Sequence, residues 1–377
     1  MNLLRSLPFA RANAPQDPGE VLRNAFLTTF ISLLAIYPLI DSQFRLQSMG
    51  SMNPILIFTI LALGLNIVVG FAGLLDLGYA AFFAIGGYTA AFLTSPSSPL
   101  PFRTDFWIAL AASWLVAAVC GLILGAPTLR LRGDYLAIVT LAFGEIVPRV
   151  FLNLESLTRG SKGMNPVGRP HIPWPGEGGI VQRELFATDQ TLWYYLIFII
   201  GAISVFIILR LRDSRLGRAW MAMREDEVAA ASMGIDPVRT KLLAFALGAS
   251  FSGFAGSLFA SMLQFIDPFQ FQFDISIMVL SMVILGGIGN VWGVIFGGVL
   301  MGAFNLILTE QATHWLRGLG SLVGFGPLQS IDLSSSKFMI YGLALVLMMM
   351  LRPEGIFPSR QRRAELHEPL AETVDGV

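Results

Sequence analysis

Runs of apolar residues without a charged side chain occupy most of this 377-residue chain. A helix needs roughly 20 apolar residues to cross the hydrocarbon core of a bilayer. Because lipid offers no partner to backbone N–H and C=O groups, a spanning segment must satisfy them within its own structure. The alternation of apolar and polar residues that marks a membrane β-barrel is absent from these runs. The sequence therefore predicts an all-α, polytopic membrane helix bundle.

We expect about ten spans, some of them short or broken. Only 13% of the residues are charged, whereas soluble domains carry about 25%. Lys and Arg together number 25, as do Asp and Glu, so net charge gives no indication of nucleic-acid binding. The expected spans are 24–42, 52–74, 77–95, 106–129, 135–154, 191–210, 242–265, 275–288, 290–309 and 337–352.

Basic residues set the expected orientation, because cytoplasmic loops carry an excess of Lys and Arg. Ten spans with both termini in the cytoplasm place four basic clusters on the cytoplasmic side of the membrane. The transmembrane domain is then 24–352, and the connection 155–190 is periplasmic. The four clusters lie in the cytoplasmic leader 1–23, at Arg130 and Arg132, in the cytoplasmic segment 211–241, and from Arg352 through the cytoplasmic tail 353–377.

Residues 275–309 form an uncharged run that allows two interpretations. One long tilted helix would place the basic tail outside, whereas two short helices that reverse at 286–290 keep it inside. We favour two helices, with Gly286, Gly287 and Asn290 at the reversal. Broken, glycine-interrupted helices line the substrate paths of transporters, although small residues also serve simple close packing of helices.

A charged insert, Arg210–Lys241, separates two long apolar runs. Leu216, Trp220 and Met223 recur at positions i, i+4 and i+7, which places them on one face of a helix. Glu225–Glu227 suits the start of a second helix, because the helix dipole favours negative charge there. The insert is predicted to form a helix–turn–helix at the cytoplasmic face. It is either a surface loop held by arginines or a docking element for a soluble partner.

The second half of this insert carries a motif. Glu227, Ala229, Ala230 and Gly234 fit the pattern E-x-A-A-x-x-x-G of the permeases of ABC importers. Over most of its length the chain resembles the LivM-type permeases of importers for branched-chain or other neutral amino acids. The further stretches that carry this resemblance are 70–91, 131–146, 157–164, 285–298 and 352–358.

The resemblance implies one subunit of a larger importer. In that family a coupling helix lies in a cleft of a separate ATPase, which uses ATP and Mg²⁺, so this chain itself needs no cofactor. The implied partners are a homologous LivH-type permease, two ABC ATPase subunits and a periplasmic or extracellular substrate-binding protein, with the permeases in the lipid membrane. The coupling residues implied here are Arg224, Glu225, Glu227, Ala229, Ala230 and Gly234.

The stretch 158–163 contains two cations where members of the family commonly have small and amide residues. This departure leaves the solute open between branched-chain amino acids, a broader set of neutral amino acids, and urea or short amides. Gly160, Ser161 and Gly163 are candidates for the substrate path. Two further functions stay open, namely a gradient-driven carrier, which does not account for the charged insert, and an accessory membrane scaffold.

Glu145 and Arg149 lie four residues apart in the fifth expected span and therefore share one helix face. Charged side chains inside a membrane are costly and often functional. A zwitterionic substrate would use them in its path, or the two side chains form a structural ion pair. The residues alone leave both interpretations open.

We find no residue pattern for catalysis or metal binding. The P-loop pattern G-x-x-x-x-G-K-[ST] is missing from the sequence, as are HExxH, GxSxG and CxxC. Cys120 is the single cysteine, and His171 has no second ligand residue at metal-binding spacing. We therefore expect a transport subunit rather than an enzyme, without a metal site and without nucleic acid as a partner.

Overall fold

The computed structural model describes residues 18–44, 49–128, 134–176, 179–304, 339, 342–343, 346–348, 350–352 and 355–357. It divides into two units, Met1–Gln47 and Ser48–Val377, and each unit is described by itself. The first unit contains one long helix, α1 (Pro18–Phe44), which covers the first expected span.

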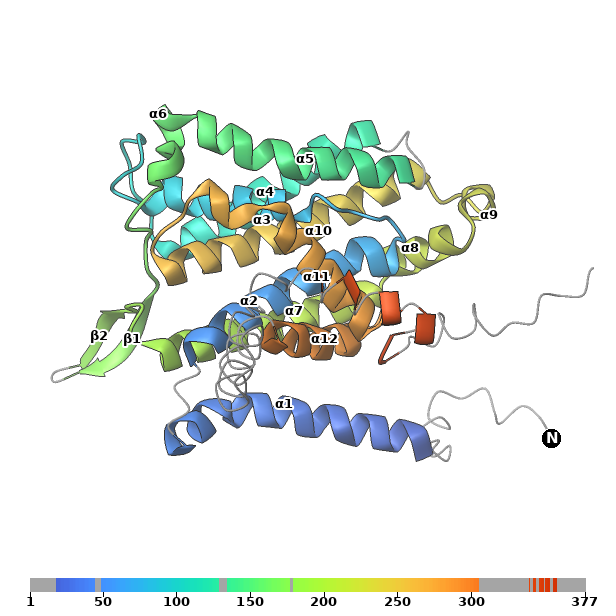
Figure 1. Ribbon diagram of the computed structural model, residues 1–377, viewed down its shortest axis with the longest axis horizontal. Helices are drawn as coiled ribbons and strands as arrows, with labels where there is room; N and C mark the ends of the chain where they lie inside the picture. Colours follow the sequence, from blue (N-terminus) through green and yellow to red (C-terminus); the bar gives the residue numbers. More distant parts are fainter. Residues whose placement is uncertain are drawn as a thin grey trace, which may run out of the picture. The chain divides into compact units, whose positions relative to one another are not determined.

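The second unit is a helical bundle with one small sheet (Figure 1). Its helix α2 (Met49–Leu65) continues directly into the π-helix η3 (Asn66–Phe71). Short elements α6, η4 and η5 lie between the longer helices and have the bounds Glu155–Thr158, Gly160–Lys162 and Pro268–Phe271. The other helices are α3 (Tyr79–Thr94), α4 (Phe106–Thr128), α5 (Asp134–Asn153), α7 (Gln190–Arg212), α8 (Arg215–Glu225), α9 (Glu227–Ser232), α10 (Pro237–Leu263), α11 (Phe273–Gly286) and α12 (Val291–Ala303).

Six helices in the described ranges are long and apolar enough to cross a membrane. They confirm a membrane helix bundle, and α3 and α12 are shorter apolar helices, as expected for some spans. Helix α1 is not among the six, and seven residues of the expected span 337–352 lie outside the described residues. The count of ten and the sidedness of the termini stay predictions. The six spans are Met49–Phe71, Phe106–Pro127, Tyr135–Asn153, Gln190–Arg212, Pro237–Leu263 and Pro268–Gly286.

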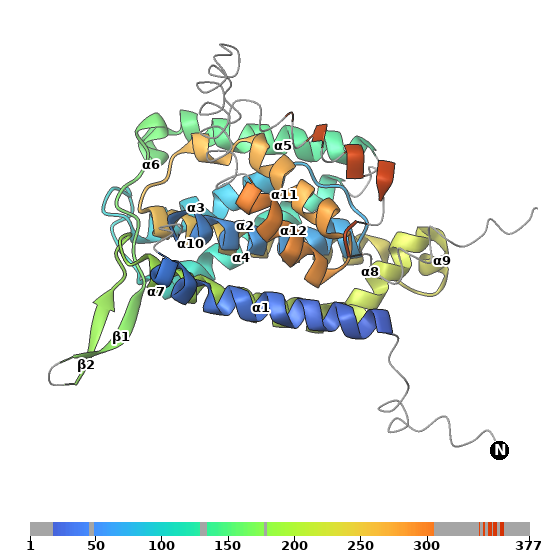
Figure 2. The same ribbon diagram turned by 60° about the horizontal axis from the view of Figure 1, so that its bottom comes forward.

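Helix α10 lies at the centre of this unit and packs against α2, α3 and α4 (Figure 2). Small residues make the crossing with α3 close. A Cβ atom at Gly86 would overlap the backbone of Gly253, and one at Gly256 would overlap the carbonyl oxygen of Phe83. Glycine therefore lets the backbones of α3 and α10 touch, which increases the dispersion contacts available to helices in lipid.

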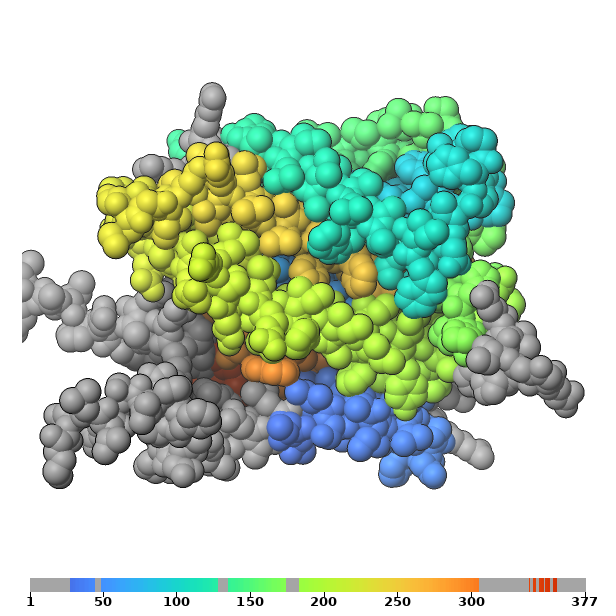
Figure 3. Space-filling view, turned by 180° about the vertical axis from the view of Figure 1, so that it is seen from behind, coloured from blue at the N-terminus to red at the C-terminus, as the bar shows by residue number. Residues whose placement is uncertain are grey.

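Burial separates inner from outer helices. The spanning segment of α2 is 94% buried, whereas those of α4 and α7 are 33% and 39% buried. Figure 3 shows α4 and α7 at the surface of the same face of the unit. Residues 106–127 and 190–209 contain no charged side chain, which suits contact with acyl chains.

The connection 155–190 is more ordered than a long loop. It contains α6, η4 and a β-hairpin of β1 (His171–Gly176) and β2 (Gly179–Glu184). The strands are antiparallel, and His171 pairs with Glu184. The all-α expectation therefore missed a two-stranded sheet. A hairpin of this length stands outside the spanning helices, where water satisfies its open edges.

The uncharged run 275–309 is broken into two helices, so the two-helix interpretation is confirmed for the described residues. Gly287 and Gly289 have φ angles of 115° and 82°, which end α11 and turn the chain. Asn290 then caps α12, because its side-chain oxygen accepts from the N–H of Trp292 at 3.1 Å. The helices α11 and α12 pack against each other.

Candidate functional site

The charged insert forms the expected helix–turn–helix, here called the α8–α9 hairpin (Arg215–Gly234). It lies at one end of the bundle, and the β1–β2 hairpin lies at the other end (Figure 1). Asp226 caps α9, since one of its carboxylate oxygens accepts from the N–H groups of Val228 and Ala229 at 2.8 and 3.0 Å. Gly234 has a φ angle of 87°, which ends the hairpin as expected.

One face of the hairpin is buried in the bundle. Trp220 and Met223 of the expected stripe have relative exposures of 0% and 6%. The indole N–H of Trp220 donates to the carbonyl oxygen of Thr240 in α10 at 2.7 Å. Because a buried indole N–H needs a partner, this bond fixes α8 to the start of α10.

Arg224 connects the hairpin to the centre of the bundle. Its Nη1 donates to the carbonyl oxygen of Gly70 at 2.6 Å, within the π-helix η3. Its side chain also lies against Gly73, where an added Cβ would come within 2.8 Å of the Arg224 Cγ. The resemblance implied a coupling role for Arg224, which stays a prediction, and the structure directs its guanidinium into the chain itself.

The π-helix η3 also contacts the turn between α11 and α12. The buried Asn66 accepts a hydrogen bond from the N–H of Gly289 at 2.9 Å. A Cβ at Gly70 would lie 2.7 Å from the same nitrogen. Arg224, η3 and the turn are therefore in one continuous set of contacts. Asn66 was missed in the sequence, because its partner is 223 positions away.

The other expected coupling residues divide into structural and exposed ones. Glu227 accepts from Lys241 Nζ at 2.7 Å, and the Lys241 side chain is only 12% exposed, so this pair fastens α9 to α10. Ala230 is buried, whereas Ala229 and Glu225 are exposed. The most exposed apolar side chains of the hairpin are Val228 at 70% and Met233 at 85%.

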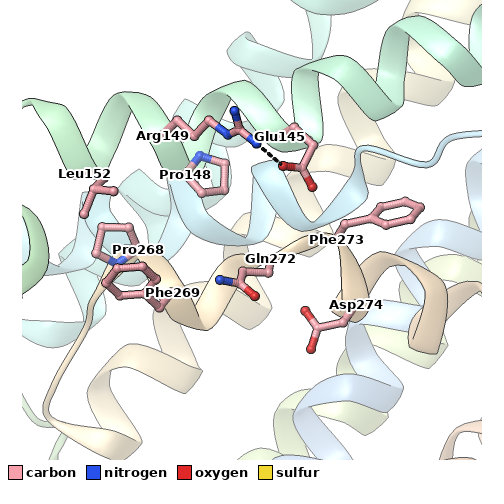
Figure 4. Close-up of a pocket in the computed structure, with 10 residues that line it drawn as sticks. Glu145, Pro148, Arg149, Leu152, Pro268, Phe269, Gln272, Phe273 and Asp274 are labelled. Atoms are coloured by element: carbon pink, nitrogen blue, oxygen red, sulfur yellow. Dashed lines mark hydrogen bonds and ion pairs between the residues drawn. The ribbon is translucent and has the colours of Figure 1, made fainter. Parts of the chain in front are cut away.

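A second candidate site lies between α5, η5 and α11 (Figure 4). Arg149 donates to Glu145 at 3.3 Å, so the two charges in the fifth expected span form an ion pair. They border a cavity of about 580 Å³ that also presents Gln272 and Asp274. Sequence reasoning missed these last two residues, since nothing local relates the start of α11 to α5.

The remaining path candidates fall into two places. Gly160 and Gly163 have φ angles of 53° and 65° and follow the C-terminal end of α5, with Ser161 exposed between them. Gly286, Gly287 and Asn290 instead lie in the α11–α12 turn. There the side-chain amide of Asn290 donates to the carbonyl oxygen of Phe357 at 2.9 Å. Neither group is part of the cavity lining.

Asp76 lies in the connection 72–78, outside the spanning helices, and is 1% exposed. Its carboxylate accepts from the N–H of Gly78 at 2.9 Å. Burial raises the pKa of Asp76 to about 6, against the opposing hydrogen bonds from Gly78 and Thr140. A folded-state pKa above the unfolded value of 3.8 means that ionisation disfavours folding as pH rises through this interval.

Asp76→Asn should therefore stabilise the chain above about pH 6.5, by up to about 3 kcal/mol, because it removes a buried charge. Asparagine keeps the acceptor for Gly78. The gain should shrink towards about pH 4, where Asp76 is protonated in the folded chain. Thermal unfolding of both proteins in detergent at the two pH values measures the difference, and an equal gain at both values would contradict the assignment.

Comparison with known proteins identifies the family. Residues 49–319 match the family described as "Branched-chain amino acid transport system / permease component". The chain is 36% identical to LivM, a high-affinity branched-chain amino acid transport system permease protein, from Salmonella typhimurium and from Escherichia coli (strain K12), over 93% of this chain and 78% of each relative. LivH from Escherichia coli is 27% identical over 65% of this chain and 79% of LivH. No solved structure matches the chain. The chain therefore belongs to the family of branched-chain amino acid transport permeases.

Proposed function

We propose that this chain is the transmembrane permease subunit of an ATP-driven importer for branched-chain or other neutral amino acids. Family membership supports the class of solute. The α8–α9 hairpin supports the energy source, because it projects from one end of the bundle and exposes Val228 and Met233. A separate ATPase would bind ATP and Mg²⁺ and receive this hairpin in a cleft.

The proposal includes an orientation. The chain crosses the inner membrane of a bacterium ten times, with the leader 1–23 and the tail 353–377 in the cytoplasm and 24–352 as the transmembrane domain. The α8–α9 hairpin is cytoplasmic and the β1–β2 hairpin is periplasmic. Seven basic residues at the hairpin end support this orientation. They are Arg210, Arg212, Arg215, Arg218, Arg224, Arg239 and Lys241.

Partners follow from the same proposal. A LivH-type permease is the expected sister subunit, which the similarity of this chain to LivH relatives supports, since homologous subunits suit a pseudo-symmetric pair. Two ATPase subunits would face the cytoplasmic hairpins of the two permeases. A substrate-binding protein would deliver the solute to the outer end, where η4 and the β1–β2 hairpin lie.

The contacts inside the chain indicate how ATPase movement would reach the helices. A force on α9 passes to α8, which is fixed by Trp220 and carries Arg224. Movement of Arg224 would displace the Gly70 carbonyl in η3 or break the hydrogen bond to it. A displacement of η3 would then move Gly289 in the α11–α12 turn through its hydrogen bond to Asn66. Because π-helical turns are irregular segments often found at functional sites, η3 is a suitable place for two backbone arrangements.

Met233→Glu tests the docking surface. A carboxylate buried without a partner in the ATPase cleft should weaken the complex by about 2 kcal/mol or more. Less ATPase subunit should then copurify with the permease, and ATP-driven leucine uptake in proteoliposomes should fall in parallel. Leu157→Glu is the matched control, since Leu157 is also exposed (45%) and lies in α6, at the end of the bundle away from the α8–α9 hairpin (Figure 1).

If the Met233→Glu variant binds the ATPase subunit and takes up leucine as well as wild type does, Met233 is not part of the docking surface. Leucine uptake by wild-type chain alone, driven by an ion gradient without ATP, would instead favour a carrier and overturn the proposal as a whole.

A further inference from the structure

The exposed faces of the spanning helices are of two kinds. The surfaces of α4 and of residues 190–209 in α7 carry no charged residue. Helix α5 is 28% buried, yet its Glu145 and Arg149 side chains are 44% and 75% exposed. A charged side chain facing acyl chains is costly, so this part of α5 faces water or protein rather than lipid.

Glu145 and Arg149 border a cavity that is lined by both charged and apolar side chains. Figure 4 shows Glu145 and Arg149 on one side, with Gln272 and Asp274 across the space from them. The cavity, about 580 Å³, falls within the range of about 300–1,000 Å³ that is usual for small-molecule sites. The apolar part of its lining is formed by Pro148, Leu152, Pro268, Phe269 and Phe273.

The charged groups here keep hydrogen-bonding capacity. The Arg149 guanidinium donates to Glu145 through Nη2 and to no other described residue. A guanidinium has five N–H donors, so most remain for a ligand carboxylate. The Asp274 carboxylate makes no hydrogen bond or ion pair with the described residues, and it is partly exposed in the first turn of α11. It is therefore available to an ammonium group.

We propose that this cavity binds the zwitterion of a neutral α-amino acid while the solute crosses the membrane. Arg149 holds the carboxylate, Asp274 holds the ammonium group, and the wall of Leu152 and Phe269 receives an aliphatic side chain. Glu145 positions Arg149 through their ion pair. This inference rests on the proposed function and names the solute site within it.

Protection from labelling tests occupancy directly. Leu152→Cys, in a Cys120→Ser background, places one thiol in the cavity wall. In the complete importer in nanodiscs, leucine should slow its reaction with a small methanethiosulfonate reagent. Isopentylamine and 4-methylpentanoate, which lack the carboxylate and the ammonium group respectively, should protect less at the same concentration. No protection by leucine, or equal protection by all three compounds, would overturn the proposal.

Uptake kinetics separate this site from the function it rests on. Arg149→Gln and Asp274→Asn should each lower the kcat/KM of ATP-driven leucine uptake by about tenfold or more, because each removes one charge-assisted bond to the solute. ATPase retention should stay normal. Glu155→Gln, beyond the end of α5, is the control and should leave uptake unchanged. If wild-type leucine uptake needs ATP but both cavity variants have the wild-type kcat/KM, the cavity is not the solute site and the proposed importer function is retained.

Discussion

Arg224→Ala is expected to lower ATP-driven leucine uptake by at least about tenfold while the importer still assembles and hydrolyses ATP. The substitution removes a charge-assisted hydrogen bond, which contributes about 1.5–3 kcal/mol. It leaves the Gly70 carbonyl without its 2.6 Å donor. Movement of the hairpin would then no longer reach η3. Parallel assays of uptake and ATP hydrolysis in proteoliposomes measure the number of solutes moved per ATP.

Two further variants make this test specific. Arg218→Ala removes a cation from the same helix. Among the described residues, Arg218 donates only locally, to the carbonyl oxygen of Asp213 at 2.7 Å, so uptake should be retained. Arg224→Lys should give an intermediate ratio, because lysine keeps the charge without the planar guanidinium. An unchanged ratio of uptake to ATP hydrolysis in Arg224→Ala would show that the contact with Gly70 has no part in coupling.

Gly256→Val should prevent accumulation of folded protein. The added Cβ would overlap the Phe83 carbonyl oxygen in α3, and both groups belong to helix backbones that cannot rotate away. Overpacking a tight core costs about 1–3 kcal/mol even where side chains can adjust, and here the whole α3–α10 crossing must open. Fluorescence-detected size exclusion of the detergent extract measures the folded fraction.

Gly201→Ala is the matched control for this prediction. A Cβ at Gly201 in α7 would meet only Ile60 side-chain atoms at 3.7 Å, an ordinary contact. This variant should accumulate like wild type. Normal accumulation of Gly256→Val would mean that α3 and α10 do not cross as closely as described.

Local features of the fold could be predicted from the sequence. The i, i+4 spacing of Glu145 and Arg149 anticipated their ion pair. The stripe of Trp220 and Met223 anticipated the buried face of α8, and Gly234 anticipated the end of α9. Each of these depends on residues within a few positions of one another, where helix geometry alone fixes the neighbours.

Contacts between distant segments could not be predicted in this way. Arg224 and Gly70 are 154 positions apart, and nothing in either stretch indicates the other. The same applies to Asp274, which reaches the Glu145 cavity only because α11 packs beside α5. The motif marked Glu227 for coupling to the ATPase, which stays a prediction, and its carboxylate accepts a hydrogen bond from Lys241. A one-dimensional pattern does not distinguish a residue that contacts a partner from one that positions the contact.

The side of the membrane on which the α8–α9 hairpin lies is the most direct test of the importer proposal. Ser232 is exposed on this hairpin, so Ser232→Cys in a Cys120→Ser background gives one reporter thiol. A membrane-impermeant maleimide should label it in inverted inner-membrane vesicles stripped of ATPase, and added ATPase should block the reaction. Labelling of the same thiol in intact, unpermeabilised cells would contradict the account.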